Sequence, residues 1–106
     1  MNTITETRKI DLNDDTEFEV FEVMDYVSGS IQADAVEAAW GTAVLTIQRS
    51  NDGSNWYAME TPTTLTIDSI TNELDLSPIK YLRAKVTTAE GGALHALLTL
   101  VAKGYP

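Results

Sequence analysis

The single histidine, His95, is the side chain best suited to acid–base chemistry near neutral pH. A nucleophilic triad would need a hydroxyl group on one side of its ring and a carboxylate on the other. His95 stands between Leu94 and Ala96 in an alternating apolar run, which is typical of an outward-facing strand residue. Carboxylates in pairs could serve glycoside chemistry, but here they are scattered, as on a solvated surface. We therefore expect no catalytic residue and no enzyme activity.

A second group of side chains has the spacing of a calcium loop. Asp11, Asn13 and Asp15 alternate along the chain, and Glu22 stands where an EF-hand has its last carboxylate. Thr16 occupies the position at which that loop needs glycine, and a strand pattern follows. A looser surface calcium site made by Asp11, Asn13 and Asp15 remains the metal candidate. We favour an acidic turn without metal, so we expect no cofactor.

Aromatic side chains form the third group, because they could stack on a sugar or anchor an interface. We expect Trp56 to cap the core beside a hairpin, since large aromatic residues are buried on average. Trp40 is expected to be more open and is an interface candidate, and Tyr105 is the best candidate for an intermolecular contact. The other aromatic residues considered for such a platform are Tyr26, Tyr57 and Tyr81.

The clearest strand signal in the chain is the stretch 42–59. Leu45 and Ile47 alternate with polar residues, which is the two-residue period of a strand. The sequence Ser-Asn-Asp-Gly-Ser-Asn at 50–55 then favours a tight hairpin turn. Residues 56–59 are predicted to form the returning strand.

A second hairpin is predicted from residues 80–88 and 93–103, joined by a turn at 89–92. The first of these strands alternates cleanly. The second has apolar residues on both parities, because Leu97 and Val101 oppose the main apolar set. These two residues mark either a core buried on both faces or an intermolecular interface, and we select them as interface candidates.

Three earlier segments are less regular. In residues 17–24, Phe18 and Phe21 fall on opposite parities, which predicts a β-bulge near Val20 and Phe21 or a strand buried on both faces. Residues 25–30 are predicted to contain a bend. For residues 31–39 the composition favours helix and the alternation favours strand, and we predict a strand.

Composition limits the classes of protein to consider. The chain of 106 residues is expected to form one domain, residues 1–106, and its hydrophobic fraction of 43% is typical of a folded protein. With no cysteine, disulfides and thiolate metal sites are excluded. A net charge of −9 disfavours binding to nucleic acid and to anionic membranes, and it indicates solubility or, as the alternative, docking of an acidic face on a basic protein. The first residues lack the basic start and apolar core of a signal peptide, and no apolar run is long enough for a membrane helix, so we expect neither.

Seven to nine short strands with frequent turns predict an all-β fold, an antiparallel two-sheet sandwich that is jelly-roll-like. Residues 1–12 are expected to provide a first strand, with Ile4, Ile10 and Leu12 facing inward. Alternatively, residues 1–10 form an extended arm that reaches a neighbouring molecule.

Two motifs carry a resemblance to known families. Residues 50–56 have the form S-x-D-G-x-x-W, which resembles the hairpin of discoidin-like, galactose-binding-like sandwiches. The same hairpin, followed by LDLSPIKYLRAKV at 74–86 and a glycine-rich turn, is similar to small β-sandwich virion proteins of tailed bacteriophages. The resemblance covers residues 43–101, and its motifs mostly encode turns and core.

The second resemblance implies a non-enzymatic structural role in a phage virion, assembled in the host cytoplasm. A capsid decoration or cement protein is the leading hypothesis, and a neck or fibre part is also implied. The implied partners are copies of the chain, with a trimer favoured, and the major capsid protein or other virion proteins. The alternative, implied by the first resemblance, is a carbohydrate- or cell-surface-binding module.

Overall fold

The computed structural model describes residues 3–104 of the chain. These residues form ten β-strands, and none of them belongs to a helix that is long and apolar enough to cross a membrane. The strands are β1 (Thr3–Asp11), β2 (Phe18–Glu22), β3 (Tyr26–Ala35), β4 (Val44–Ser50), β5 (Tyr57–Ala58), β6 (Thr64–Leu65), β7 (Ser69–Ile70), β8 (Leu74–Asp75), β9 (Tyr81–Thr88) and β10 (His95–Gly104).

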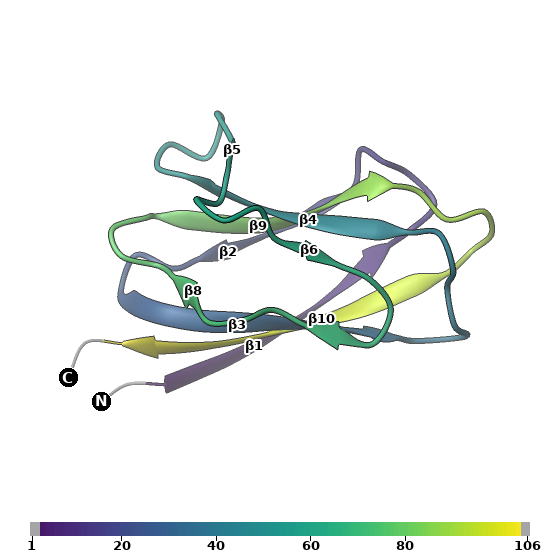
Figure 1. Ribbon diagram of the computed structural model, residues 1–106, viewed down its shortest axis with the longest axis horizontal. Coiled ribbons are helices and arrows are strands. Elements are labelled where there is room, and N and C mark those ends of the chain that lie inside the picture. Colours follow the sequence, from purple (N-terminus) through teal and green to yellow (C-terminus); the bar gives the residue numbers. More distant parts are fainter. Residues whose placement is uncertain (1–2, 105–106) are drawn as a thin grey trace.

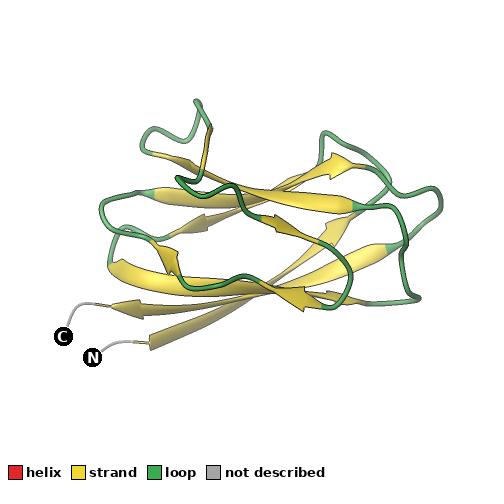
Figure 2. Cartoon of the chain, viewed as in Figure 1, coloured by secondary structure: helices red, strands yellow, loops and turns green. Residues whose placement is uncertain are grey.

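The strands form two antiparallel sheets that pack face to face (Figure 1). Sheet A has the order β1-β10-β3-β7, with β8 also paired to β3. Sheet B has the order β2-β9-β4-β5, with β6 also paired to β4. Figure 2 shows these two layers of strands, which are joined by loops at both ends. The predicted all-β antiparallel two-sheet sandwich is confirmed.

The core lies between the sheets, where the predicted alternation holds. In β9, Leu82, Ala84 and Val86 are all 0% exposed, and the residues between them face solvent. In β10, Leu98 and Leu100 are buried in the same way. Full burial of each leucine stabilises the fold by about 1.5–3 kcal/mol, so these alternating side chains fix which face of each strand points inward.

The turn of the central hairpin is held by its own side chains. The Asp52 carboxylate Oδ1 accepts hydrogen bonds from the backbone N–H groups of Asn55 (2.8 Å) and Ser54 (2.9 Å). Gly53 has a φ of 77°, which only glycine adopts without strain. Ser50 Oγ accepts the N–H of Gly53 at 2.9 Å. The hydrogen bonds that the Asp52 carboxylate accepts hold its pKa far below the usual value, with the N–H of Asn55 as the largest cause.

The returning strand is shorter than predicted. Only Tyr57 and Ala58 pair with β4, opposite Arg49 and Gln48. The chain then leaves the sheet around Pro62 and pairs with β4 again at Thr64–Leu65. Proline has no backbone N–H, so it interrupts this edge of sheet B.

The predicted bulge in β2 is wrong. The register from Phe18↔Lys85 to Phe21↔Leu82 is regular, Phe21 is 0% exposed and Phe18 is 42% exposed. The two phenylalanines therefore lie on opposite faces of one regular strand. Phe18 tolerates the outer face because the guanidinium of Arg83 covers its ring, at 4.9 Å from the ring centroid.

Of the bend predicted within residues 25–30, only Asp25 takes part in a turn, which closes with a hydrogen bond from the N–H of Tyr26 to the carbonyl of Val23 at 3.0 Å. From Tyr26 onward the prediction is wrong, because β3 continues to Ala35. The predicted strand at 31–39 is confirmed as far as Ala35, after which the chain turns. Gly29 explains the misleading pattern. A Cβ atom there would lie 2.7 Å from the carbonyl oxygen of Val101, so this glycine permits close strand contact and makes no turn.

The extended arm is wrong for the described residues. β1 pairs with β10 along its whole length, from Thr3↔Lys103 to Asp11↔His95. Ile10 is 1% exposed, as expected for an inward position of a first strand. Met1 and Asn2 lie outside the described residues.

The turn at residues 89–92 does not close a hairpin, contrary to our prediction. β9 belongs to sheet B and β10 to sheet A, so this connection crosses between the layers. The Glu90 carboxylate Oε1 accepts the N–H groups of Thr42 (2.8 Å), Ala43 (3.0 Å) and Gly41 (3.1 Å). Turn composition predicted a reversal within one sheet, but the connection crosses between the sheets, and its Glu90 carboxylate binds the distant segment 41–43.

Candidate functional site

The outer face of sheet B carries a stack of an arginine between two aromatic rings. The guanidinium carbon of Arg83 lies 4.5 Å from the ring centroid of Trp56 and 4.9 Å from that of Phe18. Phe18 comes from β2, Arg83 from β9, and Trp56 immediately precedes β5. We refer to these three residues as the aromatic–arginine stack.

The fold positions Arg83 at the centre of this stack. Its strand lies between β2 and β4, and its register neighbours are Val20 and Gln48. Arg83 Nε donates a hydrogen bond to Gln48 Oε1 at 2.7 Å. Partial burial lowers the pKa of the guanidinium, which nonetheless stays protonated at neutral pH. The side chain is therefore fixed before any partner arrives.

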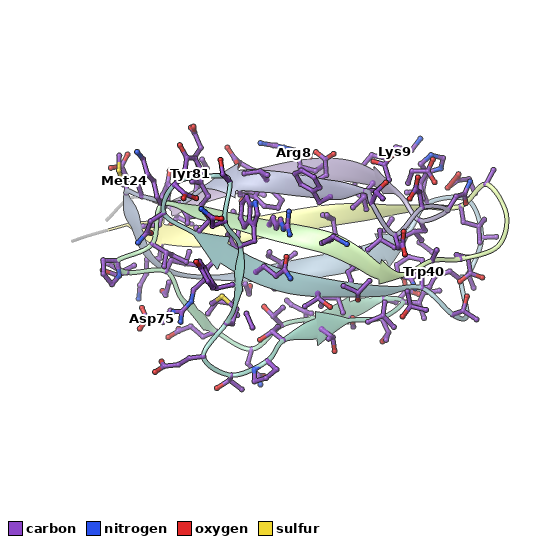
Figure 3. The ribbon with its side chains drawn as sticks, turned by 90° about the horizontal axis from the view of Figure 1, so that it is seen from above. Arg8, Lys9, Met24, Trp40, Asp75 and Tyr81 are labelled. Carbon is purple, nitrogen blue, oxygen red and sulfur yellow. The ribbon has the colours of Figure 1, made fainter. Side chains whose placement is uncertain are left out.

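A second cation lies next to the stack on the same face. Lys85 is the register partner of Phe18, and its Nζ donates to the backbone carbonyl of Asp15 at 2.6 Å. Figure 3 is viewed from above and looks down on this sheet, with Tyr81 toward one end and Trp40 at the other. In a chain with 7 basic and 16 acidic residues, two cations beside partly exposed aromatic rings distinguish this face.

Both tryptophans lie where the sequence did not place them. Trp56 is only half-buried and stacks on the outer face, so the prediction that it caps the core is wrong. Trp40 is 3% exposed and belongs to the core cluster, so the prediction that it is more open is also wrong. Its Nε1 donates to the carbonyl of Ala43 at 3.2 Å. This local hydrogen bond satisfies the indole and allows its burial.

A groove of about 990 Å³ runs along the side of the molecule where the edge strands of both sheets are short. It lies between the β5–β6 edge of sheet B and the β7–β8 edge of sheet A. Tyr57 and Ile70, which line it, are 66% and 61% exposed. Its charged lining residues are Arg49, Asp52, Glu60, Glu73 and Asp75, so carboxylates predominate.

His95 has a titratable partner that the sequence did not reveal. Its Nδ1 lies 2.6 Å from Glu37 Oε2, and its backbone N–H donates to Glu37 Oε1 at 3.2 Å. The hydrogen bond from the imidazole is the largest cause of a lowered pKa at Glu37. The pair ties the turn after β3 to the start of β10. Glu37 lies beyond the end of its strand, so no alternation could have indicated this contact.

The predicted calcium residues lie at the end of β1 and in the turn that follows. Asp11 Oδ1 accepts the backbone N–H of Asn13 at 2.9 Å. The neighbouring Asp14 accepts both the N–H and the hydroxyl of Thr16, each at 2.8 Å, and these bonds lower its pKa. Among residues 3–104, no three or more His, Cys, Asp and Glu side chains gather in a group that could hold a metal. The site at Asp11, Asn13 and Asp15 stays a prediction.

Of the interface candidates, Leu97 and Val101 lie on the outer face of sheet A and are 39% and 42% exposed. The alternation predicted this orientation. The register neighbours of Leu97 are Lys9 and Asp34, and those of Val101 are Thr5 and Ser30. Each apolar side chain therefore has polar residues on both neighbouring strands. Their role as contacts stays a prediction, and Tyr105 lies outside the described residues.

Several solved structures are similar to this chain. The SPBc2 prophage-derived protein YomS matches with a TM-score of 0.61 at 9% identity, over 97% of this chain and 98% of that one. A chain of the cyanophage Pam1 capsid asymmetric unit matches with a TM-score of 0.47 at 11% identity, over 99% and 86%. A Bacillus endospore appendage protein, described as a disulfide-linked pilus, matches with a TM-score of 0.46 at 12% identity, over 97% and 89%. No family model and no curated protein sequence matches the chain.

Proposed function

We propose that the chain is a non-enzymatic structural protein of a phage virion, and that it is a decoration or cement protein of the capsid. It would be incorporated into the virion in the host cytoplasm. Its partners would be the major capsid protein or another virion protein, together with further copies of the chain. The likeness of its fold to YomS, which is described as prophage-derived, supports the choice of this class.

The observation that carries the proposal is the aromatic–arginine stack on the outer face of sheet B. Tryptophan and arginine, with tyrosine, are the residue types most enriched among the few that dominate interface energies. Arg83 is already ordered by two rings and by Gln48, so it loses less side-chain entropy when a partner binds. A sheet face with such a stack is suited to adhesion to another protein surface.

We also interpret the fold as jelly-roll-like, in agreement with a capsid-associated role. β5 and β6 occupy one edge position of sheet B, and β7 and β8 one edge position of sheet A. This leaves two facing sheets of four strand positions each. Consecutive strands lie in opposite sheets, except for β4 to β5, β5 to β6 and β7 to β8, which stay within one sheet. Eight strand positions in two sheets are the arrangement of a double-sheet jelly roll.

The test is whether the chain is present in virions and where it binds. Mass spectrometry of purified particles from the encoding phage should detect the chain, and immunogold labelling should cover the head. Labelling confined to the neck or fibres would replace decoration by another structural role, and absence from particles would refute the proposal.

The stack itself is tested with the purified major capsid protein assembled into shells. Arg83→Ala and Trp56→Ala should lower cosedimentation of the chain with the shells by about tenfold or more, as expected for residues at the centre of an interface. Tyr57→Ala, which changes an exposed aromatic residue outside the stack, should bind as the unchanged chain does. Equal binding by all four proteins would remove the outer face of sheet B from the mechanism.

The groove favours a second candidate function, a carbohydrate- or cell-surface-binding module. Its exposed Tyr57 could stack on a sugar ring, and its carboxylates, such as Glu60 and Glu73, could accept hydrogen bonds from sugar hydroxyls. A glycan array separates the two functions. Binding that Tyr57→Ala abolishes and Trp56→Ala leaves unchanged would favour this candidate.

A further inference from the structure

β1 is an edge strand, and among the strands of residues 3–104 that lie at a sheet edge it is the longest. It has nine residues, and it pairs on one side only, with β10. β2, at an edge of the other sheet, has five residues. An unpaired edge presents a row of N–H and C=O groups that another strand can bind. In Figure 3, Arg8 and Lys9 mark this long edge, on the side of the molecule opposite Asp75.

We propose that β1 pairs antiparallel with β1 of a second copy of this chain, about a two-fold axis at Thr7. In this register the strand is complementary to itself. Glu6 lies opposite Arg8 twice, once on each side of the axis, and Ile4 lies opposite Ile10. The full set of pairs is Thr3 with Asp11, Ile4 with Ile10, Thr5 with Lys9, Glu6 with Arg8, and Thr7 with Thr7.

The neighbouring registers are worse for a physical reason. A shift that centres the pair on Glu6 places two glutamates directly opposite each other, and a shift that centres it on Arg8 does the same with two arginines. Like charges directly opposite destabilise an antiparallel pair. A slip that pairs residues of opposite parity would set the inward residues of one copy against the outward residues of the other. The register centred on Thr7 avoids all three defects.

Glu6 and Arg8 share the inward parity of β1 with the buried Ile10. Within one chain they form an ion pair of 3.5 Å, and Arg8 also covers the ring of Phe21, at 5.1 Å from its centroid. Inward charges on an edge strand normally prevent pairing, because a partner strand would bury them without a counter-ion. In the proposed register each of these charges gains an opposite charge from the second copy, so the usual barrier is replaced by an attraction.

This charge pattern also selects the occupant of the edge. The chain as a whole carries a net charge of −9, which repels other copies in most orientations. In an antiparallel pair of two β1 strands, each Glu6 faces Arg8 of the other copy. An unrelated acidic or basic strand would not place an opposite charge at both positions, so a second copy fits this edge better. Symmetric contacts of this kind, with the same patch on both subunits, are the commonest in soluble oligomers.

The inference deepens the self-association part of the proposed function, and the two can fail separately. The aromatic–arginine stack lies on the outer face of sheet B, whereas β1 is an edge of sheet A. A two-fold contact alone gives a dimer, and combined with a trimer it gives an assembly with an even number of copies.

The test exploits the two opposed charges. Glu6→Arg leaves two cations at these positions, and Arg8→Glu leaves two anions, so each variant should repel itself and dimerise at least about tenfold more weakly than the unchanged chain. Mixed together, the two variants should form a heterodimer, because every cation then faces an anion. Lys9→Glu, which faces Thr5 in this register and changes the net charge as Arg8→Glu does, should dimerise normally.

Light scattering over a dilution series gives the masses, and circular dichroism checks that each variant is folded. An unchanged chain that dimerises, two weakened single variants and a restored mixture would support the proposal. A monomer at all concentrations, an assembly with three copies, or single variants that dimerise like the unchanged chain would overturn it. None of these results depends on the cosedimentation with capsid shells, in which Arg83→Ala and Trp56→Ala test the proposed function.

Discussion

The guanidinium of Arg83 lies 4.5 Å from the centre of the Trp56 ring, on the outer face of sheet B. The two residues come from different segments of the chain, and neither belongs to the core. An exposed cation–π contact of this kind stabilises a fold by about 0.5–1 kcal/mol. The contact is therefore strong enough to order both side chains and too weak to be essential for folding.

This contact predicts a measurable coupling between Arg83 and Trp56. In urea unfolding, Arg83→Ala and Trp56→Ala should each lower the free energy of unfolding, and the double variant should lose about 0.5–1 kcal/mol less than the sum of the single losses. Thr99, on the outer face of the other sheet, provides a distant position at which substitution should add to Arg83→Ala without coupling. Strict additivity of Arg83→Ala and Trp56→Ala would show that the stack contributes no stability.

Burial of Trp40 predicts a large loss of stability on truncation. Trp40→Ala should lower the free energy of unfolding by about 3–5 kcal/mol, because it opens a cavity in the core and removes the bond to the Ala43 carbonyl. Tyr57→Ala, at an exposed aromatic position, should change it by less than about 0.5 kcal/mol. Chemical denaturation compares the two, and similar small losses would argue against a buried Trp40.

Glu90 predicts a dependence of stability on pH. The N–H groups of Thr42 and Ala43 lower the pKa of its carboxyl group in the folded chain. The folded state therefore binds the proton less readily than the unfolded state, so this stabilisation is present above the ordinary pKa and is lost as the pH falls through it toward the folded value. The loss of stability caused by Glu90→Gln should be largest near neutral pH and should shrink in acid.

Urea unfolding of both proteins from about pH 7 to about pH 3 tests this dependence, since the range spans the titration of a glutamate. Glu60→Gln, in the exposed lining of the groove, is the matched control. A difference between the unchanged chain and Glu90→Gln that stays constant over this range would contradict the carboxylate clamp.

The close strand contact at Gly29 predicts that adding one methyl group there lowers stability, although the sequence around Gly29 resembles a bend. In Gly29→Ala the new Cβ would lie 2.7 Å from the Val101 carbonyl oxygen and 3.1 Å from Leu76 Cδ1, so the strands must move apart. Overpacking of this kind costs about 1–3 kcal/mol of unfolding free energy. Gly91→Ala, where no atom lies within 4 Å of the new Cβ, should cost far less. Equal losses in thermal unfolding would refute the close strand contact.

Much of the local structure could be predicted from the sequence. Alternation along a strand depends only on the pleat of the backbone, so Leu82, Ala84 and Val86 could be placed in the core and Leu97 and Val101 on the surface. The Asp52-Gly53 turn could also be predicted, because its hydrogen bonds form between residues at most three positions apart.

The predictions failed where the outcome depends on a distant residue. Gly29 resembles a bend until β10 is placed beside it, and Phe18 resembles a core residue until Arg83 covers it. Glu37, the partner of His95, lies in the turn after β3, and no sequence pattern connects these two residues.

The sequence by itself therefore determined that this is an all-β protein, where most of the strands lie, and which face of the clearest strands is apolar, because these follow from local backbone geometry and side-chain type. Only the tertiary structure decided that the connection at 89–92 crosses between the sheets, that Trp40 is buried and Trp56 only half-buried, and that Phe18, Arg83 and Trp56 meet. These features depend on which strands lie side by side, and the burial of the whole core selects that arrangement.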